Sequence, residues 1–369
     1  MVRQYRKPED KYSRVQNQVK ELLNSPLDGL AKELLGLLSD PSYKQNIEYV
    51  SNLLERLPKQ LDRHFYFDAW MVQSIMEAWS NDLIPDSSRI VPTRHHIWGY
   101  EPIMIPPVTG VYLIYIPPKE SETIPSLLDY PWLCHELGHY LLKLRGHYDQ
   151  LFNGFLPHLE ARISRLKRMS ISDRGLAQTR SQAVIDEIDA RWRSSRWVQE
   201  LAIDVIALWS CGPAYLAAFQ DEHEKIDKPF IIESTHPPAE LRTYALLQAA
   251  RRLGWDRYLQ ELEQMQQNWY QKIPASIGNE YRSLRNTELI EGCLEAAFDY
   301  CKYIKIPPLR PEDLELRRFS LQQKADFSHG IELIVASWLV YHENEAYYRD
   351  WEERTLNQLI NEILQVSKP

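Results

Sequence analysis

The chain has 369 residues, of which 44% are hydrophobic and 25% charged, so it has the composition of a soluble globular protein with ample material for a core. Its formal net charge of −8 argues against a general nucleic-acid-binding protein, because such proteins carry an excess of basic residues. Four scattered cysteines form no C-x-x-C pair, and the first residues lack the apolar segment of a signal peptide, so we expect a cytoplasmic protein with reduced cysteines.

Residues 1–90 are expected to form a helical N-terminal region. Apolar residues recur at helical spacing in four segments, 15–23, 30–38, 47–57 and 65–79. Pro41 and Pro58 separate the last three of these segments from one another, as is common where helices begin or end. No residue type in this region indicates chemistry, so a packing or partner-binding scaffold is the expectation.

Residues 91–250 are expected to contain the catalytic core, and the first part of this region changes character. Frequent prolines between 84 and 131 exclude long helices. Between them, the run 111–116 (VYLIYI) is β-branched and aromatic, and it predicts a strand of a short sheet.

The segment 131–143 (PWLCHELGHYLLK) contains an H-E-x-x-H motif in a helical setting. On a helix, His135 and His139 lie on one face about 40° apart around the axis, so both imidazoles can point at one Zn²⁺ ion. Glu136 can reach the open side of the metal, where a carboxylate accepts a proton from zinc-bound water. Gly138 costs a helix about 1 kcal/mol relative to alanine, which indicates that another backbone or a substrate comes close there.

The segment 147–199 is predicted to form two or three helices that are rich in arginine and lysine. Acidic residues are interleaved with the basic ones, which favours a solvated helical face. The alternative is a cationic cap near the active site that selects acidic substrates.

The helical segment 197–209 carries Glu200 and Asp204 on one face, among apolar residues. Buried carboxylates are costly unless a positive charge neutralises them. We predict Glu200 as the third zinc ligand, which gives a His₂Glu set with water in the fourth position. Asp204 is then expected to hydrogen-bond a ligating histidine and fix its tautomer. The alternative is a buried ion pair with an arginine from the region 162–196.

A third motif, STHPPAELR, covers residues 234–242. Thr235 is predicted to cap the helix that follows, with the prolines after it in the first turn. His236 then lies just ahead of the helix, and Arg242 lies further inside it. Near a metal ion, both side chains could stabilise the oxyanion of a tetrahedral intermediate.

The three motifs, HELGH, ELAID and STHPPAELR in this order, together resemble the gluzincin zinc peptidases of the HtpX and CAAX-prenyl-protease kind, whose pattern is HExxH, ExxxD and THPxxxxR. The resemblance covers roughly residues 108–250. It implies a zincin-like core in which the substrate lies along a sheet edge as an added strand. Residue by residue, it implies His135, His139 and Glu200 as zinc ligands, Glu136 as general base, Asp204 behind the ligands, and His236 and Arg242 on the substrate or oxyanion side.

Two departures limit what the resemblance implies. Members of that family are usually embedded in a membrane, whereas the longest apolar run of this chain, 330–341, is too short to span a bilayer and contains Glu332. We therefore expect no membrane span, and a membrane-protein or prenylated substrate is not carried over. HELGH also resembles the soluble ImmA/IrrE-type regulatory peptidases, which cleave repressors, although the STHPP segment fits that group less well.

Residues 251–369 are expected to be helical, and their apolar stripes suit core packing or a contact with another subunit or a regulatory partner. The expected fold class is α+β, mostly α-helical, with a zincin-like metallopeptidase core, a short sheet and helical additions at both ends. The expected activity is that of a zinc metalloendopeptidase acting on protein or peptide substrates. Two alternatives remain open: a zinc-containing regulatory or sensor module with little turnover, and a latent protease that a partner or small molecule activates.

Overall fold

The computed structural model describes most of the chain. The described residues are 11–39, 44–57, 63–79, 90–94, 98–105, 108–117, 126–144, 146–171, 176–193, 196–273, 281–282, 284–315, 318, 327 and 329–366.

Helices dominate the described residues and one small sheet accompanies them, which confirms the expected mostly helical α+β class. The N-terminal helices are α1 (Lys11–Glu21), α2 (Asp28–Leu38), α3 (Lys44–Arg56) and α4 (Arg63–Trp79). The strands are β1 (Ile90–Arg94), β2 (Gly99–Ile105) and β3 (Val108–Ile116), and the 3₁₀ helix η2 (Leu127–Asp129) leads from them to α5 (Pro131–Lys143). The later helices are α6 (His147–Ile171), α7 (Leu176–Arg193), α8 (Arg196–Cys211), α9 (Pro213–His223), α10 (Ala239–Arg252), the 3₁₀ helix η3 (Asp256–Tyr258), α11 (Gln260–Tyr270), α13 (Thr287–Tyr303), α15 (Gly330–Glu343) and α16 (Glu345–Val366).

Strand β3 forms the middle of the sheet, and its side chains alternate between two hydrophobic cores. The strand order is β1-β3-β2, with β1 parallel and β2 antiparallel to β3. Val111 and Leu113 pack with side chains of the N-terminal helices α1–α3, whereas Ile114 and Ile116 belong to the larger core that contains α5. This alternation follows from the two-residue period of an extended strand, and it confirms the strand predicted at 111–116.

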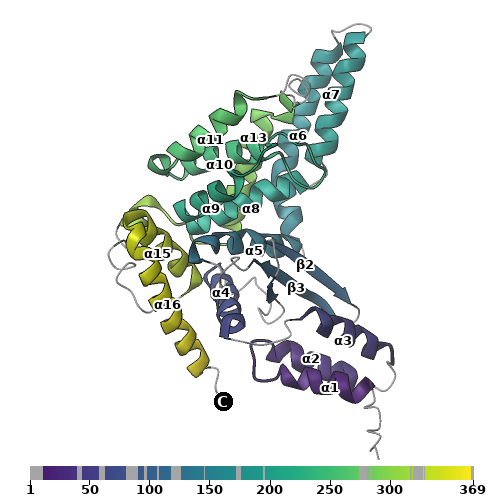
Figure 1. The fold of residues 1–369 in the computed structure, drawn as a ribbon. Coiled ribbons are helices and arrows are strands. Elements are labelled where there is room, and N and C mark those ends of the chain that lie inside the picture. The colour runs from purple at the N-terminus through teal and green to yellow at the C-terminus, as the bar shows by residue number, and fades with distance from the viewer. Residues whose placement is uncertain are drawn as a thin grey trace, which may run out of the picture.

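The arrangement of the elements buries α5 in the centre of the molecule. Helices α1–α3 lie on one side of the sheet and α5 lies on the other, while α6 and α7 project away from the body as a helical hairpin (Figure 1). All residues of α5 from Pro131 to Leu142 are buried, and only Lys143 at its end is exposed. The motif on α5 therefore lies inside the protein.

Helix α15 contains the long apolar run that was noted in the sequence. Its residues from Leu333 to Val340 are buried in the larger core, where α15 packs against α4, α9 and α16. Core packing thus accounts for the apolar character of α15. Of the helices that the structure describes, none combines the length and the apolar character needed to cross a membrane.

Helix α5 packs closely against α8, and Gly138 makes this packing possible. A Cβ atom at position 138 would lie 2.9 Å from Cγ2 and 3.4 Å from Cγ1 of Ile203. The group that comes close to Gly138 is therefore a side chain of α8. The glycine is needed for helix–helix packing.

Gly138→Ala is expected to destabilise the fold, although alanine is the better helix former by about 1 kcal/mol. The new methyl group would clash with Ile203, whose branched side chain has few alternative rotamers, and overpacking of a core costs about 1–3 kcal/mol. Urea unfolding should therefore show a net loss of about 1 kcal/mol in the free energy of unfolding.

Gly36→Ala is the matched control, because Gly36 lies in α2 with no atom within 4 Å of an added Cβ. This substitution should raise the free energy of unfolding by about 0.5–1 kcal/mol. The loss in Gly138→Ala should disappear in an Ile203→Ala background. Equal increases in the free energy of unfolding for Gly138→Ala and Gly36→Ala would contradict this explanation.

Candidate metal centre

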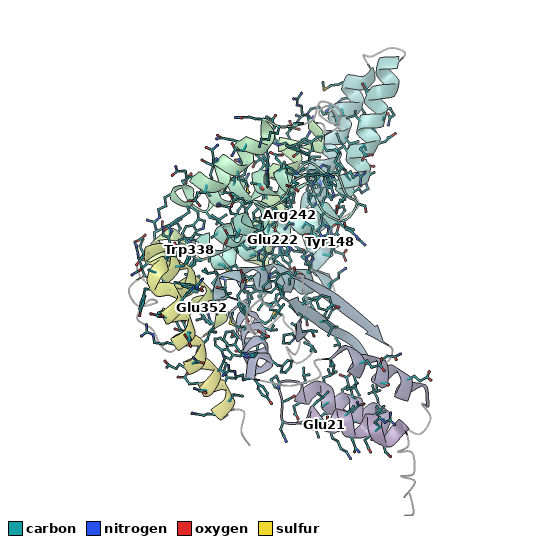
Figure 2. The ribbon with its side chains drawn as sticks, in the orientation of Figure 1. Glu21, Tyr148, Glu222, Arg242, Trp338 and Glu352 are labelled. Atoms are coloured by element: carbon teal, nitrogen blue, oxygen red, sulfur yellow. The ribbon has the colours of Figure 1, made fainter. Side chains whose placement is uncertain are left out.

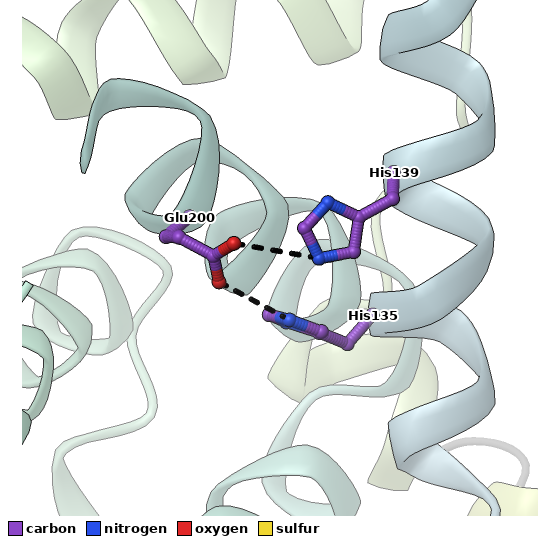
Figure 3. A group of neighbouring side chains, drawn as sticks. All are labelled: His135, His139 and Glu200. Carbon is purple, nitrogen blue, oxygen red and sulfur yellow. Dashed lines mark ion pairs between the residues drawn. The ribbon is translucent and has the colours of Figure 1, made fainter. Parts of the chain in front are cut away.

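Three buried side chains from two helices converge in the interior of the protein (Figure 3). Glu200 Oε2 lies 3.6 Å from Nε2 of His135, and Glu200 Oε1 lies 3.5 Å from Nε2 of His139. One ligand atom of each residue lies within 4.8 Å of the other two. The exposed fractions of His135, His139 and Glu200 are 4%, 9% and 5%. This buried group could hold a metal ion.

Helical periodicity and helix packing produce this geometry. His135 and His139 are four residues apart on α5, so their rings lie on the same side of the helix with centroids 5.1 Å apart. Glu200 faces both rings because α8 packs against α5 next to it, at Gly138 and Ile203. Glu200 thus lies against the histidine pair, where the sequence interpretation expected it.

The Glu200 carboxylate fits a cation better than it fits a hydrogen-bonded ion pair. Its distances to both imidazoles exceed the usual hydrogen-bond range, and its Oε2 atom is buried without a hydrogen-bond partner among the described residues. A buried oxygen without a hydrogen-bond partner lowers the stability of the folded protein by about 1–3 kcal/mol. A divalent cation between the three ligand atoms would supply the missing partner. Two imidazoles and one carboxylate are a donor set suited to first-row transition metals.

Asp204 holds the outer side of the His135 ring. Its Oδ1 atom lies 3.0 Å from Nδ1 of His135, and the Nε2 atom of that ring is directed at Glu200. Tyr215 donates its hydroxyl proton to Asp204 at 2.6 Å, and Arg242 donates to the same carboxylate from Nε at 2.9 Å and from Nη2 at 2.7 Å. A proton held on Nδ1 leaves the lone pair on Nε2. The network therefore favours the tautomer that a metal ligand needs.

The ion pair on α8 differs from the one that the sequence suggested as an alternative. Asp204 pairs with Arg242 of α10, and no arginine of the described residues lies within salt-bridge distance of Glu200. In the region 162–196, Arg162 and Arg165 pair with a glutamate of α13. Of the described basic residues in 147–199, Arg196 alone lines the cleft in front of the histidines.

The pKa values of the three residues differ strongly from each other. Burial alone would lower the pKa of His135, but the interactions with Asp204 and Glu200 outweigh it and raise this pKa to about 9. Burial lowers the pKa of His139 to about 3, so this ring is neutral at neutral pH. Burial alone would raise the pKa of Glu200, but the neighbouring histidines and Arg242 lower it to about 2. Only His135 therefore holds a proton that a cation must displace.

Glu136 lies next to the group on the wall of a cleft of about 920 Å³. Its side chain is buried with 6% exposure, and burial raises its pKa to about 7, although the charge of His135 acts to lower it. A carboxyl group with this pKa can both accept and donate a proton near neutral pH, which suits general acid–base chemistry.

His236 and Arg242 line the same cleft in different settings. The side chain of His236 is 54% exposed, and its Nε2 atom lies 3.8 Å from Oε1 of Glu200. Arg242 is buried, and it directs Nε and Nη2 at Asp204, which raises the pKa of the guanidinium despite its burial. Both side chains lie within the site, but only that of His236 is open to solvent over most of its surface.

The helix cap predicted at Thr235 was wrong. Helix α10 begins at Ala239, and Pro238 precedes it without a side-chain hydrogen bond. Pro238 has the extended conformation, with φ −51° and ψ 141°, so the helix cannot start as early as Thr235 requires. The Thr235 hydroxyl contacts Nδ1 of His236 at 3.0 Å.

Two further residues contact His135, and sequence reasoning missed both of them. The Tyr215 hydroxyl lies 3.2 Å from Nδ1 of His135, but Tyr215 is on the next helix after α8, and no local pattern predicts such a contact. Trp132 packs edge-on against His135, with centroids 5.3 Å apart and planes at 72°. Its position three residues before His135 on α5 is a signal that could have identified it.

Comparison with models of protein families, with curated proteins and with solved structures returned no match. What the site can do is therefore inferred from its own residues and geometry.

Purified protein is expected to bind one divalent transition-metal ion per chain, and Glu200→Gln should remove most of this binding. The amide keeps the size of the side chain but loses the charge that offsets the cation. We expect a loss in affinity of more than about 100-fold, the upper range for residues that only support a ligand. Elemental analysis after dialysis measures the metal content.

Glu233→Gln is the control for this substitution, because the side chain of Glu233 is 56% exposed and its Oε2 atom lies 3.8 Å from Nδ1 of His236. This variant should keep the full metal content. Equal metal contents in Glu200→Gln and the wild type would exclude Glu200 as a ligand.

Metal binding at about pH 7.5 is expected to release about one proton per cation, because the pKa of His135 is raised to about 9. Below this pKa the ring is mostly protonated and cannot bind a cation through Nε2. Each further unit of pH decrease should therefore weaken binding about tenfold. Calorimetry in buffers with different protonation enthalpies counts the released protons. A count near zero, with an affinity that does not depend on pH, would contradict the role of His135.

Proposed function

We propose that the protein is a zinc-dependent metalloendopeptidase that hydrolyses peptide bonds of protein substrates. The observation that carries this proposal is the convergence of His135, His139 and Glu200 beside the carboxylate of Glu136, on the wall of a cleft. Three ligands and a separate carboxylate are the parts that metal-assisted hydrolysis needs. The resemblance to gluzincins rests on the same residues.

The donor set favours zinc among the common cations. Two imidazole nitrogens and one carboxylate oxygen suit Zn²⁺, whereas Mg²⁺ and Ca²⁺ prefer oxygen ligands. When bound, the cation would polarise the scissile carbonyl and lower the pKa of water at the site. His135, His139 and Glu200 would hold it.

Glu136 is the proposed general base. It follows His135 directly and is buried at the cleft wall, so it accepts a proton from the attacking water and then donates it to the leaving amine. Its pKa of about 7 supports both steps.

The edge of the sheet supports an extended peptide as the substrate. Strand β2 is an edge strand of the described sheet, and Trp98 and Gly99 at its start line the cleft. A polypeptide that pairs with this edge as an added strand would reach the cleft that Glu136 also lines. Main-chain hydrogen bonds would hold such a substrate whatever its side chains are.

His236 and Arg242 have different proposed roles. His236 is open to the cleft, so it can contact a bound substrate and stabilise the oxyanion. Arg242 acts through Asp204, which in turn orients His135, so Arg242 is a positioning residue. Truncating one member of such a buried pair leaves an uncompensated charge and costs about 3–5 kcal/mol.

Glu136→Gln is expected to abolish peptide hydrolysis and to leave the metal content unchanged. Glutamine has nearly the same size but cannot accept the proton, and a general base contributes about 100- to 10,000-fold to the rate. Zinc content and the cleavage of unfolded casein or of a peptide library should be measured on the same samples.

Glu233→Gln should retain both zinc and cleavage, since it removes an exposed carboxylate of the same loop as His236. A biological effect that survives Glu136→Gln would contradict the peptidase and favour the zinc-containing sensor. A zinc-loaded wild type that cleaves only after a partner or small molecule is added would identify the latent protease.

A further inference from the structure

His223 at the C-terminal end of α9 combines deep burial with access to the cleft. It is 3% exposed, yet it lines the cleft together with Trp132 and Glu222. Its Nδ1 atom lies 2.9 Å from the carbonyl oxygen of Phe219. A carbonyl oxygen can only accept, so Nδ1 carries the proton of this hydrogen bond and Nε2 carries a lone pair.

The His223 ring is held in place by two aromatic side chains. It stacks on Phe219, with centroids 3.7 Å apart and planes at 12°, and it is nearly parallel to Trp132, at 6.0 Å and 11°. Burial and the positive charge of Arg242 lower the pKa of His223 to about 3, so the ring is neutral at neutral pH. The ring therefore presents an oriented, uncharged acceptor.

The acceptor atom of His223 is unused within the described part of the chain. Nδ1 is bonded to Phe219, and Nε2 has no hydrogen-bond partner there. Nε2 is also not among the fully enclosed polar atoms, so it opens onto the cleft that the residue lines. A donor of a bound ligand can therefore reach this nitrogen and form a hydrogen bond with it. No step of the proposed hydrolysis uses this atom.

Trp132 connects His223 to the metal-binding group. Its ring lies 5.3 Å from that of His135 and 6.0 Å from that of His223. The centres of the two imidazole rings are therefore separated by no more than the sum of these two distances. About three residues of an extended polypeptide span that length. A substrate group that reaches His223 lies within about three residues of the scissile bond.

We propose that Nε2 of His223 accepts a hydrogen bond from an N–H donor of the substrate and so positions the residue bound at this end of the cleft, an inference that rests on the proposed peptidase function. A basic side chain and a main-chain amide both offer such a donor. The other charged side chains of the cleft are of both signs and so do not decide between the two donors; they include Asp129 and Glu222 on one side of the balance and Lys143, Arg196 and Lys225 on the other. Figure 2 shows Glu222 and Arg242, both cleft residues, in the middle of the molecule.

Nuclear magnetic resonance on the full-length, zinc-treated protein with ¹⁵N-labelled histidine tests this contact without turnover. The Nε2 resonance of His223, assigned by its loss in His223→Phe, is followed while butylguanidinium or N-methylacetamide is added. A saturable shift with butylguanidinium identifies the basic side chain, and a shift with N-methylacetamide alone identifies the main-chain amide. The resonance of His147, which is buried and bonded to Tyr300, is the control and should not move. No shift of His223 with either probe would overturn the proposal.

Cleavage of a peptide library provides the second measurement. His223→Phe keeps the aromatic stacking but lacks the acceptor, and His223→Gln keeps an acceptor. His223→Phe should lower kcat/KM at least tenfold for the peptides that the wild type prefers, and His223→Gln should restore part of it. The same rate and the same residue preference in His223→Phe and the wild type would overturn the proposal. A library that the wild type leaves intact would count against the peptidase itself, and the resonance titration would still decide the role of His223.

Discussion

The close packing of α5 against α8 is the constraint on which the site depends. The absence of a side chain at Gly138 lets Ile203 approach, and this contact brings Glu200 against the histidine pair in an interior where unbalanced charge is costly. Asp204, one turn further along α8, is buried in the same way and is balanced by Arg242. Glu200 has no arginine within salt-bridge distance among the described residues; the imidazole of His135, which is protonated below a pKa of about 9, offsets its charge, and a metal cation would take the place of that proton.

The surroundings of the histidines keep this geometry rigid. Asp204 accepts hydrogen bonds from Tyr215 and Arg242 and contacts Nδ1 of His135, so the ring on α5 is tied to α8, α9 and α10 at once. Trp132 extends this support to His223 through aromatic contacts. Contacts with side chains of four helices therefore hold the His135 ring in the orientation that the candidate metal site needs.

The sequence predicted the parts of the structure that depend on local periodicity. The four-residue spacing on α5 and on α8 indicated two buried helices whose polar residues face each other, and the run 111–116 indicated the central strand. It did not predict Arg242 as the partner of Asp204, or the contact of Tyr215 with His135, because both depend on how α9 and α10 fold back onto α8. At Thr235 a local cap preference was overruled by the prolines that follow, which hold the chain extended.

Whether His135, His139 and Glu200 bind one cation together is tested most directly by anomalous scattering from a crystal of the zinc-treated protein, measured on both sides of the zinc absorption edge. We expect a single strong peak between the two Nε2 atoms and the Glu200 carboxylate, within about 2.0–2.2 Å of each ligand atom. A crystal with no peak there, or with zinc bound only elsewhere, would contradict it.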